Sequence, residues 1–437
     1  MKILVISNLY PPHYVGGYEL RCQQITEALR RRGHTVHVLT SNHGLNGAPG
    51  NGAPAAPPEA GVERTLRIHG FFGHPWLGIR ALRTLEFHNH RVVRDAIAWF
   101  RPDVVHVWNL GGLSKSICTT LERLGLPTVY DVSDHWIARS LAADVWIDWW
   151  NRRQHRPATR MLRLTWQVTG LRQRWDRVAP TRPAHEFRFS RIYFCSRALR
   201  ELTAAKGYPV NHGAVIHCPV DTSRFDGLPA AASHRLRRWL YVGRLAEDKG
   251  VMTALRALAQ LKARFPGELF IYGKGDPAYT AQLDAFIAAN RLPVHLRSAP
   301  AAEMPAVYRQ HDALLFTSEW EEPFALTPLE AMASGIPVIG TTTGGSRELL
   351  RHGDNALTYT AGDAAELAHR VVELSTDDAR RVRLAATARA EVRSRYAEPV
   401  IVDQIESYLD ESIQTWQPEP AVARLVVPLT ATARGLA

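Results

Sequence analysis

The sequence contains no run of about 18 apolar residues, so no membrane-spanning helix is expected. Residues 1–7 are too short and too strand-like for a secretory signal peptide. Only four cysteines occur, and Cys22, Cys118, Cys195 and Cys218 stand far apart without metal-ligand spacing. We therefore expect buried thiols in a reducing compartment, which indicates a cytoplasmic protein.

Acidic residues are scarce in one segment. Residues 151–200 hold thirteen arginines, no lysine and two acids, an excess equal to the formal net charge of +11 of the whole chain. Six of the twelve tryptophans lie in or just before it: Trp136, Trp146, Trp149, Trp150, Trp166 and Trp175. This composition suits an anionic membrane surface or an anionic, lipid-linked or phosphorylated ligand. The alternative is a solvated helical insertion whose tryptophans pack on the domain.

Charge is also nearly absent from residues 44–61, which are mostly Gly, Ala, Pro and Asn and predict a flexible insertion. Before it, residues 2–7 form a continuous apolar run, residues 18–29 carry apolar side chains at helical spacing, and residues 35–40 form a second apolar run. This β-α-β order predicts a parallel sheet. Further strands are expected at residues 101–109, 128–133 and 191–196, the last of this half.

Residues 219–233 are interpreted as a linker, and a second set of alternating strands and helices follows them. Strands are expected near residues 239–243, 269–273, 294–296, 313–317, 337–340 and 356–358. Helices are expected at residues 250–265, 277–290, 303–309, 327–334, 346–351, 364–374, 377–396 and 399–416. The fold class is therefore α/β, with two Rossmann-like, doubly wound parallel-sheet domains facing across a cleft. The domains would span residues 1–225, with insertions at 44–61 and 136–190, and residues 226–396.

The stretch from Ser318 to Gly335 carries the strongest local signal. An apolar run precedes it, and Thr327-Pro328-Leu329-Glu330 fits a capping box with proline at the first helical position. Gly335 and the following proline end the helix. A helix start beside a strand end presents free N–H groups and the positive end of the helix dipole to one spot, which predicts an anion site.

Glu322 and Glu330 flank this anion site, with seven residues between them. Carboxylates on both sides of an anion would grip a sugar nucleotide, with phosphates in the middle and a sugar at each end. The alternative is that Glu330 is only the partner of Thr327 in the cap and Glu322 only a solvated loop charge.

The string Glu-Pro-Phe-Ala-Leu-Thr-Pro-Leu-Glu-Ala-Met-Ala-Ser-Gly at residues 322–335 resembles the E-x7-E signature of the family 4 retaining glycosyltransferases of GT-B fold. The opening, with Asn8-Leu-Tyr-Pro-Pro, then Gly16-Gly17-Tyr-Glu and later Arg32-Gly-His-Thr-Val, looks like that of the same family. The resemblance implies that residues 397–416 form a helix that crosses back to the first domain; residues 417–437 stay unassigned.

Two cations, Arg244 and Lys249, lie in Gly243-Arg-Leu-Ala-Glu-Asp-Lys-Gly250, which resembles the family's G-R motif and can clamp a diphosphate. Gly273 belongs to a Gly-Lys-Gly turn that resembles the family's turn near the base and lacks the third glycine of a dinucleotide fingerprint, so a dehydrogenase is disfavoured. Thr343-Gly-Gly-Ser-Arg-Glu348 resembles supporting architecture. The full expected donor-binding set is Gly16, Gly17, Gly243, Arg244, Lys249, Gly273, Glu322, Phe324, Ala325, Leu326, Thr327 and Glu330.

The family's first-domain histidine has no certain counterpart. Asp103-Val-Val-His106-Val-Trp108 has tryptophan where the family often has a second histidine. Asp134 and His135 end the following strand, where ligands gather in open parallel sheets. We expect catalytic roles for Glu322, Arg244, Lys249 and His135. Residues expected on the acceptor side are Glu19, His106, Trp108 and Asp134.

The resemblance implies an enzyme that moves a hexosyl or related group from a nucleoside diphosphate sugar to an acceptor hydroxyl with retention, in glycolipid, polysaccharide or glycoconjugate biosynthesis. No D-x-D-like pattern occurs, so neither a metal nor another cofactor is expected. Expected partners are a nucleotide sugar, an anionic or lipid-linked acceptor and the inner face of the membrane through residues 151–200, and no nucleic acid. The alternatives are a same-fold epimerase or phosphorylase, and a non-catalytic basic module that binds membrane or nucleic acid.

Overall fold

The computed structural model describes residues 1–45, 59–152, 156–225, 236–261, 264 and 267–417. The chain divides into two compact units: residues 1–193, 202–214 and those from 405 onward form the first, and residues 194–201 and 215–404 form the second. Residues 194–201 and 215–225 were predicted in the first domain but belong to the second unit. One reason is that the Glu348 carboxylate accepts hydrogen bonds from the N–H groups of Arg197 and Ala198.

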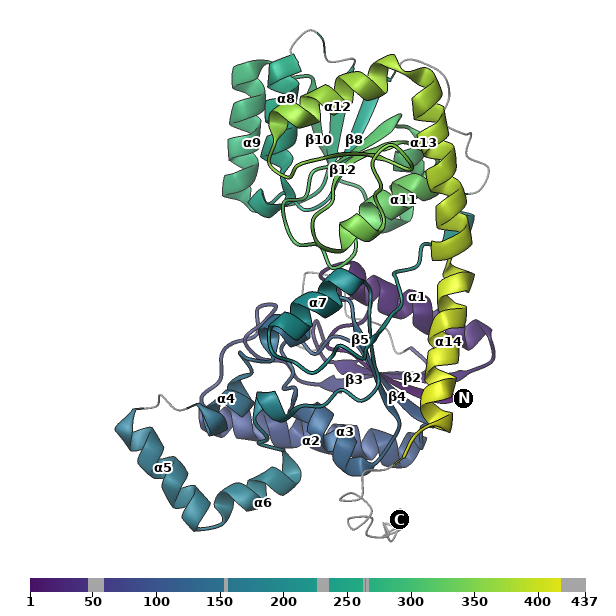
Figure 1. Cartoon of the computed structure of the whole chain (residues 1–437). Coiled ribbons are helices and arrows are strands. Elements are labelled where there is room, and N and C mark those ends of the chain that lie inside the picture. Colours follow the sequence, from purple (N-terminus) through teal and green to yellow (C-terminus); the bar gives the residue numbers. More distant parts are fainter. Residues whose placement is uncertain (46–58, 153–155, 226–235, 262–263, 265–266, 418–437) are drawn as a thin grey trace. The chain divides into compact units, whose positions relative to one another are not determined.

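The first unit is built on a seven-stranded sheet in the order β3-β2-β1-β4-β5-β6-β7 (Figure 1). The strand pairs β3–β2, β2–β1, β1–β4 and β4–β5 are all parallel. The strands are β1 (Lys2–Ile6), β2 (Thr35–Ser41), β3 (Val62–Leu66), β4 (Val104–Val107), β5 (Thr128–Val132), β6 (Ile192–Phe194) and β7 (Ala214–Val215). The sequence did not predict β3 and β7, because these edge strands are short or polar and carry little apolar signal.

The helices between these strands belong to the first unit, except that the last of them begins in the second. They are α1 (Gly17–Arg31), α2 (Ile79–Phe100), α3 (Ser116–Leu124), α4 (Val145–Asn151), α5 (Pro157–Val168), α6 (Leu171–Val178) and α7 (Arg197–Ala205). The expected insertion at 136–190 begins with a π-helical turn, Trp136–Ser140, and contains α4, α5 and α6. The expected flexible insertion lies mainly in residues 46–58, outside the described residues, as do residues 226–235 and 418–437.

The second unit contains a six-stranded sheet in the order β10-β9-β8-β11-β12-β13, and all its strand pairs are parallel. The strands are β8 (Arg238–Val242), β9 (Glu268–Tyr272), β10 (Val294–Arg297), β11 (Ala313–Phe316), β12 (Val338–Thr341) and β13 (Leu357–Tyr359). The helices are α8 (Val251–Leu261), α9 (Pro277–Asn290), α10 (Met304–Arg309), α11 (Leu326–Ser334), α12 (Ala364–Thr376) and α13 (Asp378–Glu391). Helices lie on both faces of the sheet (Figure 1). The helix expected at residues 346–351 is instead a 3-10 turn, Gly344–Glu348.

The strand order places a topological switch point in each sheet. It lies between β1 and β4 in the first unit and between β8 and β11 in the second, because the chain moves outward in opposite directions from these pairs. Ligands of open α/β sheets bind outside the carboxyl ends of the strands at such points. The doubly wound fold class predicted from the sequence is therefore confirmed, and the two switch points are where functional residues are sought.

The last helix, α14 (Glu398–Gln414), contributes residues to both units. At its start, Glu398 N–H donates to the carbonyl of Val220 in the second unit. Further along, Tyr408 Oη donates to the carbonyl of Ile192, and Arg32 forms a 2.6 Å ion pair with Glu406, both within the first unit.

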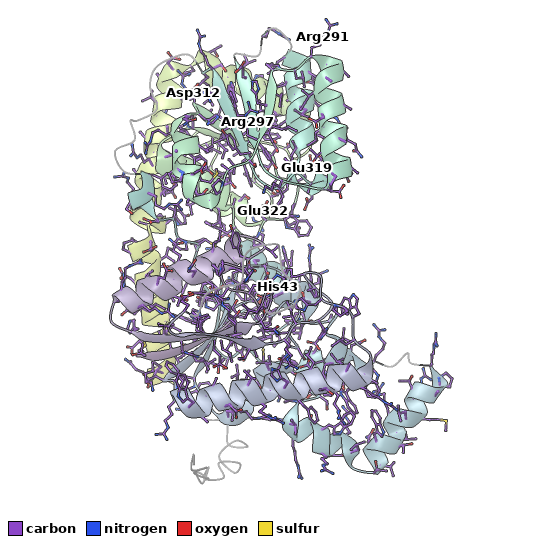
Figure 2. The ribbon with its side chains drawn as sticks, turned by 180° about the vertical axis from the view of Figure 1, so that it is seen from behind. His43, Arg291, Arg297, Asp312, Glu319 and Glu322 are labelled. Atoms are coloured by element: carbon purple, nitrogen blue, oxygen red, sulfur yellow. The ribbon has the colours of Figure 1, made fainter. Side chains whose placement is uncertain are left out.

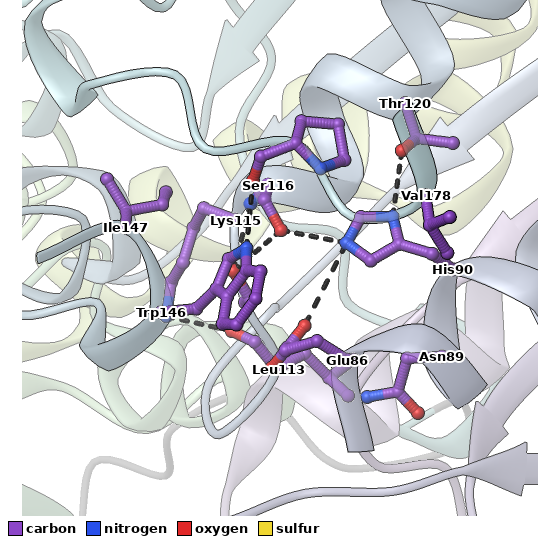
Figure 3. A network of polar contacts seen from close by, with 12 residues as sticks. Glu86, Asn89, His90, Leu113, Lys115, Ser116, Thr120, Trp146, Ile147 and Val178 are labelled. Carbon is purple, nitrogen blue, oxygen red and sulfur yellow. Dashed lines mark hydrogen bonds and ion pairs between the residues drawn. The ribbon is translucent and has the colours of Figure 1, made fainter. Parts of the chain in front are cut away.

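A buried polar network holds α2 to α3 in the first unit (Figure 3). His90 bonds Thr120 and Ser116 through its two ring nitrogens, each at 2.8 Å, and its Nε2 lies 3.8 Å from Glu86. Burial raises the pKa of Glu86 to about 7 and lowers that of His90 to about 3. Burial therefore shifts both groups toward their uncharged forms.

All four cysteines are buried free thiols, as predicted. Within the described residues no helix is both long and apolar enough to span a bilayer.

Candidate active site

The loops that follow β8 and β11 meet at the switch point of the second unit. Lys249 Nζ donates to Glu322 Oε1 at 2.6 Å, and the two side chains are only 16% and 14% exposed. Ser318 Oγ donates to the same carboxylate oxygen at 2.7 Å. Glu319 and Glu322 both lie on the loop after β11 (Figure 2). An ammonium has three donors, so Lys249 can hold Glu322 and still bind a phosphate oxygen.

Backbone contacts fix these two loops against each other. Thr317 Oγ1 donates to the carbonyl of Lys249 at 2.9 Å, and the N–H groups of Glu319 and Trp320 both donate to the carbonyl of Asp248. Gly250 has a φ of +64°, and a Cβ there would lie 1.9 Å from the carbonyl oxygen of Thr317. Glycine is thus required at this position. The close approach of the two backbones fixes the position of the neighbouring Lys249 against the loop after β11.

The N-cap of α11 lies two residues earlier than predicted, and the capping-box prediction is wrong. The N-cap is Ala325, without a side-chain cap bond, so Thr327 lies inside the first turn. Pro328 is then the third helical residue, which is tolerated because an N–H at this position would have no partner within the helix. The N–H groups of Leu326 and Thr327 in this first turn likewise have no intrahelical acceptor, and they lie beside the Glu322 loop.

Glu330 is held from a different helix. Tyr308 Oη, on α10, donates to Glu330 Oε2 at 2.9 Å. Burial raises the pKa of Glu330, while the Tyr308 hydrogen bond and the positive charge of Arg224 lower it in part. Glu330 is therefore not the reciprocal partner of Thr327 in a cap. Tyr308 was not found from the sequence, because it lies 22 residues away with no local motif.

Three further predicted donor residues, Gly243, Arg244 and Gly273, lie just after the ends of β8 and β9. Arg244 is 67% exposed and lies 3.9 Å from Asp248, so most of its guanidinium faces solvent. Its carbonyl accepts a hydrogen bond from Tyr241 Oη at 3.0 Å. Gly273 needs to be glycine, because a Cβ there would lie 1.9 Å from the carbonyl oxygen of Gly243.

The Gly344-Gly345 pair supports the Glu322 loop. Gly345 N–H donates to the carbonyl of Glu322 at 2.6 Å, and a Cβ on Gly345 would lie 2.1 Å from the carbonyl oxygen of Pro323. Phe324 is buried and its ring lies 5.1 Å from that of His217, which bonds Glu348 at 3.2 Å. His217 was also missed, because an isolated histidine before a linker carries no signal.

In the first unit, Gly16 and Gly17 lie at the start of α1. Gly16 is the N-cap, and its N–H donates to Glu19 Oε2 at 3.0 Å. A Cβ on Gly16 would meet nothing within 4 Å, so space lies over this backbone. Burial raises the pKa of Glu19, although N–H hydrogen bonds from the same turn oppose the shift.

Asp134 and His135 follow β5 and lie near Glu19. Asp134 accepts hydrogen bonds from Asn109 Nδ2 at 2.9 Å and from the Trp136 N–H at 2.8 Å. Burial raises the pKa of Asp134 to about 7, and the negative charges of Glu19 and Asp131 raise it further. His135 is half-buried and precedes the π-helical turn. The structure thus brings together Glu19 and Asp134 of the predicted acceptor-side set.

His106 and Trp108, predicted on the acceptor side, are instead core residues. They lie on one face of β4 and its extension, with ring centroids 5.1 Å apart, and they are 0% and 1% exposed. His106 Nε2 bonds Tyr193 Oη at 2.9 Å, and burial lowers the pKa of His106 to about 4. All four residues of β4 are buried, because both faces of a parallel sheet are covered by other elements, so alternation could not reveal which side chains reach solvent.

Within the described residues, no group of three or more His, Cys, Asp or Glu side chains is arranged to hold a metal ion.

Comparisons with known proteins cover nearly the whole chain. Residues 15–224 match the family model described as Glycosyltransferase Family 4, and residues 231–391 match that described as Glycosyl transferases group 1. The chain is 26% identical over 435 residues to a glycogen synthase of Mycobacterium tuberculosis, covering 96% of this chain and 97% of the relative. It is 27% identical over 402 residues to a phosphatidyl-myo-inositol mannosyltransferase of the same species, covering 89% and 92%.

Solved structures match over both units. Anabaena Alr3699/HepE in complex with UDP-glucose gives a TM-score of 0.65 at 20% identity, covering 94% of this chain and 100% of that chain. Sucrose-phosphate synthase from Thermosynechococcus elongatus gives 0.67 at 18% identity, covering 94% and 98%. These likenesses show the GT-B fold. The two family models, which match residues 15–224 and 231–391, show that the chain belongs to the group 1, family 4 glycosyltransferases.

Proposed function

We propose that this glycosyltransferase takes its sugar from a nucleoside diphosphate sugar and transfers it to an acceptor hydroxyl with retention of anomeric configuration. The observation that carries the proposal is the Lys249–Glu322 contact of 2.6 Å beside the first turn of α11. A cation, a carboxylate and helix N–H groups at one switch point match the needs of a diphosphate joined to a sugar.

In this proposal the diphosphate lies over the first turn of α11, where charge grows on its oxygens as the glycosidic bond breaks. Lys249, Arg244 and the N–H groups of residues 324–326 stabilise that charge, each contact contributing roughly 3 kcal/mol to the barrier. Glu322 accepts from a hydroxyl of the donor sugar, and Glu330 accepts from the ribose hydroxyls.

We propose a metal-independent reaction, in which Lys249 and Arg244 would face the diphosphate in place of a metal ion. Tyr308 leaves Glu330 with unused acceptor capacity for ribose, since an ionised carboxylate has about four lone-pair sites. The acceptor hydroxyl is proposed to bind in the first unit near Glu19, Asp134 and His135. We propose that the product is a polysaccharide, a glycolipid or another glycoconjugate, made in the cytoplasm. Relatives named glycogen synthase and phosphatidyl-myo-inositol mannosyltransferase support the proposed class of product.

The first test is a thermal-shift and calorimetry panel of UDP, GDP, ADP and dTDP with their sugars, in the presence of EDTA. One nucleoside diphosphate should stabilise the protein, and its sugar should be transferred to a hydroxyl acceptor with retention, followed by NMR of the anomeric proton. No stabilisation by any nucleotide would refute the proposal. Sugar isomerisation without an acceptor, or release of a sugar 1-phosphate in inorganic phosphate, would establish an epimerase or a phosphorylase instead.

A further inference from the structure

The helical pair α5–α6 leaves its apolar side chains outside the core of the first unit. Neither helix has a single buried residue. Ten large apolar side chains are prominently exposed among the described residues, and four of them lie on the twelve residues of α5. They are Met161, Leu162, Leu164 and Val168. Folding of the unit does not account for this concentration, because much of the surface of these side chains stays in solvent.

Three of these side chains form one stripe. Met161, Leu164 and Val168 follow one another at helical spacings of three and four residues, so they share one face of α5. They are 71%, 62% and 80% exposed. Pro157, four residues before Met161, extends the same face to the start of the helix. We call these four residues the α5 stripe.

The tryptophans of the segment do not belong to the α5 stripe. Trp166 lies on the other side of α5, with its ring 5.3 Å from that of Trp149, 5.9 Å from Trp150 and 4.9 Å from Trp175. Arg163 ties α5 to the end of α4 through the carbonyls of Trp150 and Arg152. The aromatic cluster therefore anchors the helix, while the stripe points away from it.

The charge around the α5 stripe is almost entirely positive. Residues 156–182 contain seven arginines and a single acid, Asp176. That acid is neutralised locally, because its carboxylate binds Arg123 and Thr181. Arg156, Arg174 and Arg177 are all exposed on this helical pair. A partner must then combine an apolar layer with dense negative charge.

We propose that α5 docks the first unit onto an anionic lipid bilayer, with the α5 stripe inserted at the headgroup boundary and the arginines on phosphate groups. A bilayer surface supplies both features over an open area, and a helix with one apolar face flanked by arginines is typical of segments that lie in that interface. This inference does not depend on which sugar the enzyme transfers.

The experiment measures binding of the full chain to vesicles of phosphatidylcholine alone and with 30% phosphatidylglycerol, by sedimentation at low and high salt. The wild type should bind the anionic vesicles at least about tenfold more tightly than the neutral ones, and added salt should weaken this binding. M161S/L164S/V168S should lose at least about tenfold in affinity. R156Q/R174Q/R177Q should lose the preference for anionic vesicles.

The matched control is Val372→Ser, which removes an exposed apolar side chain on α12 of the second unit and should bind as the wild type does. A second readout places an environment-sensitive dye at Leu164→Cys and, for comparison, at Gln173→Cys on α6; the native thiols are buried. Only the dye at 164 should shift to the blue on anionic vesicles.

If the wild-type protein does not bind anionic vesicles at low salt, the proposal is wrong. Equal binding by the triple serine variant also overturns it. A wild-type dimer that this variant converts to a monomer, without vesicle binding, would make the stripe a subunit interface instead. None of these results bears on nucleotide binding, which the Lys249 site determines.

Discussion

Replacing Lys249 by methionine tests the centre of the proposed donor site. The change keeps the length of the side chain and removes the ammonium that lies 2.6 Å from Glu322. Because both side chains are about 85% shielded from solvent, the Glu322 carboxylate would stay mostly buried, with its Ser318 hydrogen bond and without its ion pair. An unpaired carboxylate in a mostly buried site costs more than a lost surface pair and less than a fully buried one, so we expect a loss of about 2 kcal/mol in stability.

The loss of activity should be separable from the loss of stability. Removing one charge-stabilising donor should lower kcat/KM by about two orders of magnitude, which corresponds to roughly 3 kcal/mol. In K249M/E322Q the unpaired charge is gone, so the thermal midpoint should recover while kcat/KM stays low. Nucleoside diphosphate affinity, measured by calorimetry, should fall in both variants.

The control for Lys249 is Lys206→Met, which removes an exposed lysine of the first unit. It should change neither the thermal midpoint nor the affinity for nucleotide. The reasoning fails if K249M binds nucleoside diphosphate as tightly as the wild type. It fails equally if the double variant is no more stable than K249M.

Three further predictions concern other parts of the chain. Tyr308→Phe removes the hydrogen bond that holds Glu330, so it should weaken nucleoside diphosphate binding about tenfold. Because the pKa of Glu330 is raised, the affinity of the wild type should begin to fall at a higher pH than for an ordinary carboxylate as the pH is lowered. A calorimetric pH profile that stays flat would contradict this. Burial raises the pKa of Glu86 in the folded protein to about 7, from an ordinary value of 4.5. Its contribution to the free energy of unfolding is therefore present below pH 4.5 and is lost as pH rises through 7, by about 3 kcal/mol. Urea unfolding of Glu86→Gln should show no such fall. Gly250→Ala should lower the thermal midpoint far more than Gly353→Ala, because both have positive φ but only Gly250 faces a carbonyl at 1.9 Å; equal shifts would show that this contact yields.

The order of elements in the second unit was predictable because most of its strands are short apolar runs, and glycine or proline stands directly beside β8, β9, β10 and β12. β11, for instance, is the run Ala-Leu-Leu-Phe, and α9 begins at Pro277 after the capping residue Asp276, as its sequence indicates. The Glu322 loop and Lys249 were predictable for a related reason, since both follow such strands directly. Their contact with each other follows from the adjacency of β8 and β11.

Other features depend on contacts between distant residues, which a sequence pattern does not encode. Thr327 and Glu330 have the spacing of a capping box, but Tyr308 takes Glu330 and the helix begins at Leu326. His106 was predicted on the acceptor side, but it is buried and bonds Tyr193 of β6. In both cases a partner contributed by a remote element decides the role of the side chain.

The contribution of α14 to both units has a consequence for biosynthesis. Its later residues, such as Glu406 and Tyr408, bind Arg32 and Ile192 in the first unit, and Trp416 Nε1 donates to the carbonyl of Gly125. These partners leave the ribosome hundreds of residues earlier. The first unit therefore lacks its contacts with α14 until translation has nearly finished. A fragment that stops at residue 397 would lack its final helix and should be prone to aggregation.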